Sequence, residues 1–411
     1  MPRNLVLCAD GTCNAFGHSS SNVARLLQHI ELQKSDAQVV CYDQGIGTRK
    51  SEQTRILAFK SGLGESGALH LLDPPIDDWT RPWTWPFLIA SLTAGLGLRT
   101  NVRQLYVKLA RLHMPGDRVF LFGFSRGAFT VRTLAALTCR YGLPTSNDEK
   151  TARTRFARAW KLYKREFPDE DGAKREKARQ FFSDGGRSCP IHFLGLWDTV
   201  KSYGGLWPRM LPHLRHNPAV KTVRHAMSLG ERRAWFELTT WGWLDSDRLD
   251  SAAGSRLTKS ERTALADQDV IEVWFDGCHS DVGGGGGSER SSSIALRWML
   301  GEAQQAGLTL NDFGRCFQTI PSACETPEFE DSRSTIWRAI DLIPRLAITN
   351  AGRWPARFPA RPGASPRKPL DAVRKKTLWH HESVSDLSRF GSIPPDVKLC
   401  RRATLRTIDS E

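Results

Sequence analysis

Ser125 lies at the centre of the pattern Gly-x-Ser-x-Gly that residues 123–127 form. The apolar run VFLF precedes this pattern, and the helix-like run AFTVRTLAAL follows it. A sharp turn between a strand and a helix exposes a serine hydroxyl as a nucleophile, and flanking glycines keep such a turn free of steric clashes. A serine that only caps the helix is the alternative interpretation. The pattern and its position favour a nucleophilic Ser125.

A serine nucleophile needs a histidine base, and a carboxylate has to orient that histidine. In hydrolases with this strand-turn-helix corner, the acid and then the base follow the serine, each beyond the end of a later strand. Asp198 ends the apolar run IHFLGLWD, and His279 follows the run VIEVWFDGC. We therefore predict Asp198 as the acid and His279 as the base of a catalytic triad.

Three further residues offer other assignments. Asp281 lies two residues after His279 and is an alternative acid for the triad. His225 lies in VRHAMSLGERR, which we predict to be helical, so we expect a surface or packing role for it. Cys278 precedes His279, but sequence neighbours at the end of a strand point apart, and we expect a packed, inert thiol.

The tetrahedral intermediate of ester hydrolysis needs backbone N–H donors for its oxyanion. The amide of Arg126 follows the serine at the start of a predicted helix and is the first candidate. In this class of enzyme a second donor comes from the loop after an earlier strand, where Gly11 and Thr12 of the motif ADGT lie. An ordinary turn is the alternative interpretation of this motif.

Metal and cofactor sites have little support in the sequence. The 9 cysteines occur singly, without a CxxC pair or a ligand-like spacing to histidine. The acidic stretch 245–251 has Asp250 where a calcium-binding EF-hand loop requires glycine. The glycine run after His279 lacks the lysine of a Walker loop, and we interpret it as a flexible floor without side chains that lets this histidine approach the serine. We expect neither a metal ion nor a cofactor.

The elements that must position these residues alternate along the chain. Short apolar runs alternate with runs of helical period, which is typical of βαβ units and a mostly parallel sheet. The expected strands are residues 4–9, 38–43, 118–123, 191–198 and 270–277. The expected helices are residues 22–30, 101–113, 126–138 and 292–307. The sequence thus predicts an α/β fold with a mostly parallel central sheet flanked by helices.

We divide the chain into a catalytic domain, residues 1–310, and a basic, Pro/Arg-rich extension, residues 311–411, that packs on it or is tethered to it. Insertions at about 49–98 and 145–185 interrupt the domain. The first contains the apolar tract 82–98, which is compatible with an element at a membrane interface or with a buried helix. The second carries an aromatic stripe that we expect to dock on the core: Phe156, Trp160, Tyr163 and Phe167.

The chain of 411 residues has a formal net charge of +14 at pH 7, and its last part is rich in Lys and Arg. Such a region is typical of a solvated segment, and anionic lipid is favoured over nucleic acid as its partner. No Sec-type signal precedes Asp10, and single cysteines fit a reducing compartment. We expect a protein of the producing cell's cytoplasm that binds an anionic membrane surface peripherally, through residues 79–98 and the basic C-terminal region.

Several motifs occur in an order that resembles a known family: LCADGTCNAFG, NVARLL, YDQGIGT, RVFLFGFSRGAFTVRTLA, FLGLWDTV, HAMSLGERR, and GCHSDVGGG followed by ALRWML. Over about residues 3–305, the chain is similar to the α/β-hydrolase family typified by the phospholipase effectors of type VI secretion. The short motif HHESV at 380–384 is similar to a late motif of that family.

The resemblance implies an α/β-hydrolase fold and a serine esterase or lipase that acts on phospholipid acyl esters, with Ser125 as nucleophile and His279 as base. Asp198 and Asp281 both lie in family motifs, so the acid stays open between them. The insertion at 49–98 and the region after 350 depart from the family pattern, which leaves substrate and type VI delivery open. A soluble esterase or thioesterase and an inactive hydrolase-fold binding scaffold are the alternative functions.

Overall fold

The computed structural model describes the parts of the chain that form its sheet and the helices around it. The described residues are 2–11, 20–32, 38–43, 56–60, 97–164, 172–200, 214, 217–233, 236–241, 258–286, 289–319, 378–380 and 397–399. The structural findings below refer to these residues.

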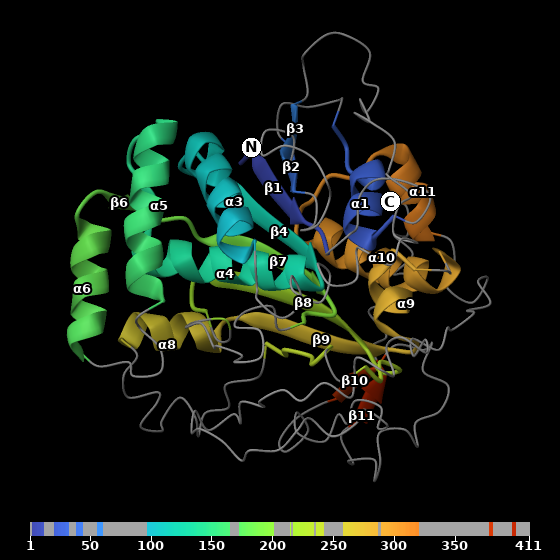
Figure 1. Ribbon diagram of the computed structural model, residues 1–411. Helices are drawn as coiled ribbons and strands as arrows, with labels where there is room; N and C mark the ends of the chain where they lie inside the picture. Colours follow the sequence, from blue (N-terminus) through green and yellow to red (C-terminus); the bar gives the residue numbers. More distant parts are fainter. Residues whose placement is uncertain are drawn as a thin grey trace, which may run out of the picture.

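A sheet of nine strands forms the centre of the described molecule, in the order β11-β10-β9-β8-β7-β4-β1-β2-β3 (Figure 1). Neighbouring strands in it are parallel, except for the antiparallel pair of β2 and β3. The strands are β1 (Asn4–Ala9), β2 (Gln38–Asp43), β3 (Ile56–Lys60), β4 (Arg118–Phe124), β7 (Ile191–Trp197), β8 (Val220–Ser228), β9 (Asp269–Phe275), β10 (Leu378–His380) and β11 (Val397–Leu399). Two short strands, β5 (Leu143–Pro144) and β6 (Gly186–Arg187), form a separate antiparallel pair.

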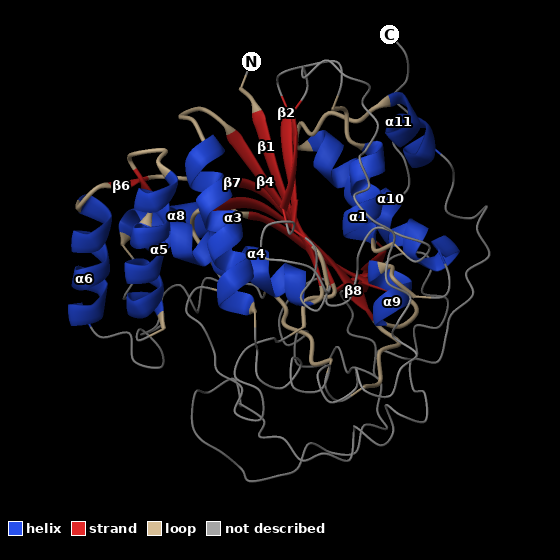
Figure 2. Cartoon of the chain, turned by 45° about the horizontal axis from the view of Figure 1, so that its top comes forward, coloured by secondary structure: helices blue, strands red, loops and turns tan. Residues whose placement is uncertain are grey.

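Helices cover both faces of this sheet (Figure 2). One layer consists of α3 (Leu98–Leu112), α4 (Arg126–Tyr141), α5 (Glu149–Tyr163) and α6 (Gly172–Ser183). The other consists of α1 (Asn22–His29), α9 (His279–Gly283), α10 (Glu289–Gln305) and α11 (Asp312–Thr319). A further helix, α8 (Lys259–Ala266), precedes β9. The mostly parallel sheet between two helical layers confirms the predicted α/β-hydrolase-like fold.

Strand β1 illustrates why its sequence is almost continuously apolar. Leu5 and Leu7 belong to the hydrophobic core under α3 and α4, whereas Val6 and Cys8 belong to the core under α1 and α10. Successive side chains of a strand point to opposite faces, so a parallel strand that is buried on both faces needs apolar residues at every position. The same two-sided burial holds for most of β4 and β7.

The carboxyl ends of the central strands lie at one level of the sheet. In the register of the sheet, Ala9 of β1 pairs with Gly123 of β4, and Phe124 pairs with Trp197 of β7. Trp197 in turn pairs with Ala226 of β8, which pairs with Val273 of β9. The residues that follow β1, β4, β7 and β9 therefore meet along the same edge, where an α/β sheet carries its functional residues.

The predicted helix around His225 is wrong. This residue lies in the middle of β8 and has no exposed surface. Six consecutive residues from Val223 to Ser228 are buried, so the segment shows no period-2 alternation that could have identified a strand. The other strands and helices named from the sequence lie where they were predicted, with ends that differ by a few residues.

The insertions and the extension are described in part. Phe156, Trp160 and Tyr163 are buried in the core, which confirms their predicted docking, while Phe167 lies outside the described residues. Most of the apolar tract 82–98 also lies outside them, as do the stretch 245–251 and most of the C-terminal extension. Within the extension, α11 packs against α1 and α10, and β10 and β11 lie beside β9 in the sheet. The domain boundary at residue 310 stays a prediction.

Candidate active site

Ser125 occupies a strained turn between β4 and α4. Its φ of 55° and ψ of −118° lie in a region that residues other than glycine rarely adopt. Its amide donates a hydrogen bond of 2.9 Å to the carbonyl of Trp197 on the neighbouring strand. The adjacent strand therefore holds the turn in place, with Ser125 at the carboxyl end of the sheet.

The two glycines of the Gly-x-Ser-x-Gly pattern make room for this turn. A Cβ atom at Gly127 would lie 2.0 Å from the carbonyl oxygen of Ala9, and one at Gly123 would lie 2.6 Å from the backbone of Ala128. Both distances are far below van der Waals contact, so a side chain at either position would push α4 away from the sheet. The glycines are thus required because β1, β4 and α4 approach one another closely.

Ser125, His279 and Asp198 form a continuous chain of hydrogen bonds. The hydroxyl of Ser125 lies 2.8 Å from Nε2 of His279, and Nδ1 of His279 lies 2.5 Å from Oδ2 of Asp198. A carboxylate only accepts hydrogen bonds, so Nδ1 donates to Asp198 and Nε2 is left to accept from the serine hydroxyl. The structure therefore brings together the three side chains that the sequence singles out, in the order Ser125, His279 and Asp198.

Asp198 is fixed by more than its contact with the imidazole. Its Oδ1 accepts the backbone N–H of Ser228 at 2.9 Å, and its Oδ2 lies 3.2 Å from the hydroxyl of Ser228. The side chain has no exposed surface, and its backbone also has a positive φ, of 39°. Strand β8 therefore fixes the orientation of the carboxylate before it meets His279.

His279 begins α9 and packs between two aromatic rings. The ring of Phe124 lies 4.6 Å from the imidazole, and the ring of Phe236 meets it edge-on at 4.8 Å. Burial lowers the pKa of His279 from its ordinary value of 6.5, and the hydrogen bond and charge of Asp198 oppose this shift. A neutral imidazole is the form that can accept a proton from a hydroxyl.

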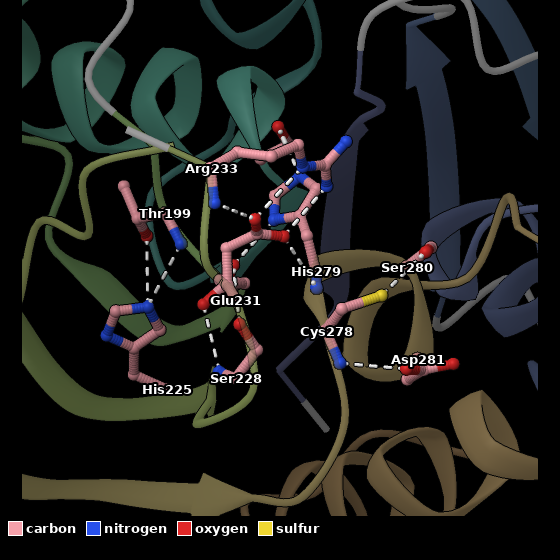
Figure 3. A network of polar contacts seen from close by, with 11 residues as sticks. Thr199, His225, Ser228, Glu231, Arg233, Cys278, His279, Ser280 and Asp281 are labelled. Atoms are coloured by element: carbon pink, nitrogen blue, oxygen red, sulfur yellow. Dashed lines mark hydrogen bonds and ion pairs between the residues drawn. The ribbon is translucent and has the colours of Figure 1, made fainter. Parts of the chain in front are cut away.

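Asp281 and Cys278 have other contacts around α9 (Figure 3). The carboxylate of Asp281 accepts the backbone N–H of Cys278 at 2.8 Å, as the N3 member of a capping box in which Cys278 is the N-cap of the short helix. The Cys278 thiol is buried, and burial raises its pKa to about 11. Its sulfur lies 3.2 Å from the hydroxyl of Ser280. Asp281 is thus a cap in this geometry, and Cys278 is a packed, protonated thiol.

The glycines that follow His279 allow close packing. Gly283 ends α9, and a Cβ atom there would lie 1.9 Å from the ring of Phe124. Gly284 has a φ of 77° and bridges to Ser21 at the start of α1. These two glycines let α9 pack closely against the serine turn and α1, which supports the interpretation of this part of the run as a floor without side chains, while its flexibility stays a prediction.

Two of the three predicted oxyanion donors, Gly11 and Arg126, lie among the described residues. The Gly11 amide donates to Oδ1 of Asp10 at 2.6 Å, and Oδ2 of Asp10 accepts from the hydroxyls of Ser21 and Tyr42, also at 2.6 Å. This buried carboxylate therefore holds the start of the ADGT loop. Thr12 lies outside the described residues. The Arg126 amide lies at the N-terminus of α4, directly after the serine, and its role and that of the loop stay predictions.

Glu231 and Arg233 are residues of the site that the sequence reasoning did not assign. Glu231 is buried, accepts the backbone N–H of His279 at 3.2 Å and accepts from the Arg233 guanidinium at 2.8 and 2.9 Å (Figure 3). That guanidinium lies 3.7 Å from the ring centroid of Phe236, which contacts His279. The only sequence signal for a role of Glu231 and Arg233 in the site was their position in the motif GERR, between β8 and β9, which both end at the site.

No group of His, Cys, Asp and Glu in the described parts of the chain is arranged to hold a metal ion. Likewise, no helix among the described residues is long and apolar enough to cross a membrane.

The comparison with protein families gives a match over most of the chain. The family described as T6SS, Phospholipase effector Tle1-like, catalytic domain matches residues 3–302. Among curated proteins, the uncharacterized protein YEL023C of Saccharomyces cerevisiae is 32% identical over 242 residues, which are 57% of this chain and 32% of that protein. The chain therefore spans about a third of the length of this relative.

Two solved structures are similar at low sequence identity. An uncharacterized protein from Pseudomonas aeruginosa has a TM-score of 0.39 and 20% identity, with 78% of this chain and 48% of that chain covered. The Tle1 effector bound to the VgrG spike of the type 6 secretion system has a TM-score of 0.36 and 14% identity, with 78% and 77% covered.

Proposed function

The chain belongs to the family of Tle1-like catalytic domains of type VI secretion phospholipase effectors, and on this premise we propose that it is a serine hydrolase that cleaves phospholipid acyl esters. One observation carries the proposal: the Ser125 hydroxyl, on its strained turn, lies within hydrogen-bond distance of His279, which contacts the buried Asp198. Nucleophile, base and orienting acid are the groups that hydrolysis through an acyl-enzyme requires.

The first half of the reaction transfers the acyl group to the serine. Nε2 of His279 takes the hydroxyl proton as Oγ of Ser125 attacks the ester carbonyl, and a tetrahedral oxyanion forms. The Arg126 amide donates a hydrogen bond to that oxyanion, and the Thr12 amide is the second donor, because the single N–H of Gly11 already donates to Asp10. As the intermediate collapses, the imidazolium gives its proton to the departing alcohol, which leaves as a lysophospholipid.

The second half releases the fatty acid. Water enters next to His279, which removes one proton while the water oxygen attacks the acyl-enzyme carbonyl. Collapse of the second tetrahedral intermediate returns the proton to Oγ of Ser125 and frees the carboxylic acid. Asp198 stays ionised throughout, holds the tautomer with the proton on Nδ1 and stabilises the transient imidazolium. The reaction needs no cofactor.

The substrate class rests on the family, and the proposal extends to the membrane surface. Residues 79–98 and the basic region of 311–411 dock the enzyme on anionic bilayers, where attraction of Lys and Arg to lipid headgroups adds to the insertion of apolar side chains. Whether the protein is delivered by type VI secretion or acts in the producing cell is a separate property that catalysis does not require.

Labelling with a fluorophosphonate tests the nucleophile. We expect the full chain to react covalently at Ser125, and the Ser125→Ala variant to be unlabelled and inactive on p-nitrophenyl esters while it retains the wild-type circular dichroism spectrum. Ser146, on an exposed loop, provides a matched control, because Ser146→Ala removes a hydroxyl without touching the site. Turnover by Ser125→Ala at the wild-type rate would refute the proposal.

Lipid profiling tests the substrate. Vesicles of phosphatidylethanolamine and phosphatidylglycerol should yield lysophospholipid and free fatty acid in equal amounts with the wild-type enzyme and neither product with Ser125→Ala. If the enzyme hydrolyses monomeric short-chain esters but leaves vesicles and micelles intact, the result supports the alternative function of a soluble esterase.

A further inference from the structure

A second buried histidine–carboxylate pair lies beside the site, on the strands next to Asp198. His225 of β8 pairs in the sheet register with Leu196 of β7 on one side and with Glu272 of β9 on the other. Nδ1 of His225 lies 2.8 Å from Oε1 of Glu272. The histidine has no exposed surface, and the carboxylate is buried as well. The pair therefore lies buried on one face of the sheet, where a polar group persists only with partners.

The other ring nitrogen of His225 contacts the residue that follows Asp198. The backbone N–H of Thr199 donates to Nε2 of His225 at 3.2 Å, and the Thr199 hydroxyl lies at the same distance from it. Figure 3 shows the imidazole directed toward Thr199. Because Nδ1 faces a carboxylate and Nε2 faces an N–H, Nδ1 donates to Glu272 and Nε2 accepts from Thr199.

On the basis of this geometry and of the proposed function, we propose that His225, held by Glu272, is a positioning residue that fixes the turn carrying the catalytic acid. The imidazole acts as an acceptor for the Thr199 amide and thereby sets the backbone on the C-terminal side of Asp198. Ser228, three residues further along the same strand, holds the carboxylate itself. Strand β8 thus fixes both the backbone and the side chain of Asp198.

The backbone at Asp198 needs such support because its φ of 39° is unfavourable for a residue with a side chain. The Asp198 amide donates to the carbonyl of Ala226 at 2.8 Å, so β8 also holds the N-terminal side of the turn. If the Thr199 contact is removed, the peptide after Asp198 loses its partner inside the sheet. The turn can then relax to a negative φ, which moves the carboxylate relative to His279.

The pair also connects this turn to the loop that contacts the helix of the nucleophile. Oε1 of Glu272 accepts the backbone N–H of Trp241 at 2.6 Å, and the Thr239 amide donates to the Thr199 carbonyl at 2.8 Å. Arg132 of α4 donates to the carbonyl of Thr239 and lies over the Trp241 ring. The helix that begins at the nucleophile and the turn of the acid are therefore joined through one loop and one histidine–carboxylate pair.

Two variants of His225 separate its role as an acceptor from its volume. His225→Gln keeps an oxygen that can accept from Thr199 and an N–H that can donate to Glu272. The double variant with His225→Leu and Glu272→Met replaces the whole pair with apolar side chains, so that no carboxylate is left buried without its histidine partner. His192→Leu is the matched control, because His192 lies on β7 with its ring on the carbonyl of Ala306, at the opposite end of that strand.

We expect the double variant to lose about 10²-fold in kcat on a soluble ester, with KM unchanged, since small misplacements of catalytic groups have effects of this size. His225→Gln and His192→Leu should retain most of the activity. The acid limb of the double variant's kcat/KM profile should move to lower pH, because the contact with Asp198 raises the pKa of His279.

The deciding measurement repeats the double variant in an Asp198→Asn background. A positioning role predicts no further loss there, because the acid that the pair positions is already gone. Equal losses in both backgrounds, or a His225→Gln variant as impaired as the double variant, would overturn the proposal. These results test the role of His225 alone. If the proposed function itself were wrong, the Ser125→Ala variant would remain active.

Discussion

Ser125 and Asp198 are the two residues other than glycine that adopt a positive φ among the described residues, and they follow adjacent strands, β4 and β7. Each such conformation costs of order 1–3 kcal/mol, so the surrounding structure has to hold it. A direct hydrogen bond joins the two turns, because the Ser125 amide donates to the carbonyl of Trp197, the residue before Asp198. The positive-φ strain among the described residues other than glycine is therefore concentrated at Ser125 and Asp198.

Replacement of each candidate acid should separate their roles. We expect Asp198→Asn to lower kcat by about 10⁴-fold, because the amide no longer holds the tautomer of His279 that accepts the serine proton. Asp281→Asn should leave kcat close to the wild-type value, since an asparagine oxygen can still cap α9 at Cys278. Steady-state rates on p-nitrophenyl butyrate measure both. A larger loss for Asp281→Asn than for Asp198→Asn would reverse the assignment.

Gly127 should be intolerant of even the smallest side chain. An alanine Cβ there would lie 2.0 Å from the carbonyl oxygen of Ala9, so α4 has to shift, and we expect a loss of stability of about 3 kcal/mol together with loss of activity. Gly172→Ala is the matched control, because nothing lies within 4 Å of the Cβ it would add at the start of α6. Urea denaturation checks both variants, and equal stabilities would contradict the packing argument.

The sequence was sufficient for the three residues of the hydrogen-bonded chain because each lies at or just beyond the end of an apolar run. Parallel strands buried on both faces produce such runs, and their carboxyl ends share one edge of the sheet. Ser125, Asp198 and His279 could therefore be placed near one another without any knowledge of contacts. The sequence favoured Asp198 as the acid and left Asp281 as an alternative, since a cap such as Asp281 differs from a triad acid only in where its carboxylate points.

The roles of His225 and Glu231 could not be predicted for a different reason. The partner of His225 is Glu272, and this contact depends on the register of β8 against β9, which a single sequence does not give. Glu231 contacts the backbone of His279 across 48 residues of chain. The packing of Gly283 against the Phe124 ring is likewise a tertiary contact, which composition alone presents as loop flexibility.

The apolar tract within 82–98 should act in membrane binding. Deletion of residues 82–94 is expected to weaken sedimentation with phosphatidylglycerol vesicles more than it lowers hydrolysis of a soluble ester, because an interfacial element contributes apolar insertion and little else. Raising the ionic strength should weaken the remaining binding through the basic C-terminal region, since salt screens attraction to anionic headgroups. If vesicle binding and soluble activity fall by the same factor, the tract belongs to the core.

The pH profile of kcat/KM should reflect the buried position of His279. Burial, the largest cause, disfavours the imidazolium and lowers the pKa below 6.5, and the charge of Arg233 acts in the same direction. Asp198 and Glu231 oppose the shift without reversing it. The base works only when neutral, so activity should persist below pH 6.5 and decline as the pH falls through the lowered pKa. Asp198→Asn should move the acid limb of the kcat/KM profile to still lower pH, because Asp198 raises the pKa of His279. A wild-type acid limb with its midpoint above pH 6.5 would show that a different group limits the reaction.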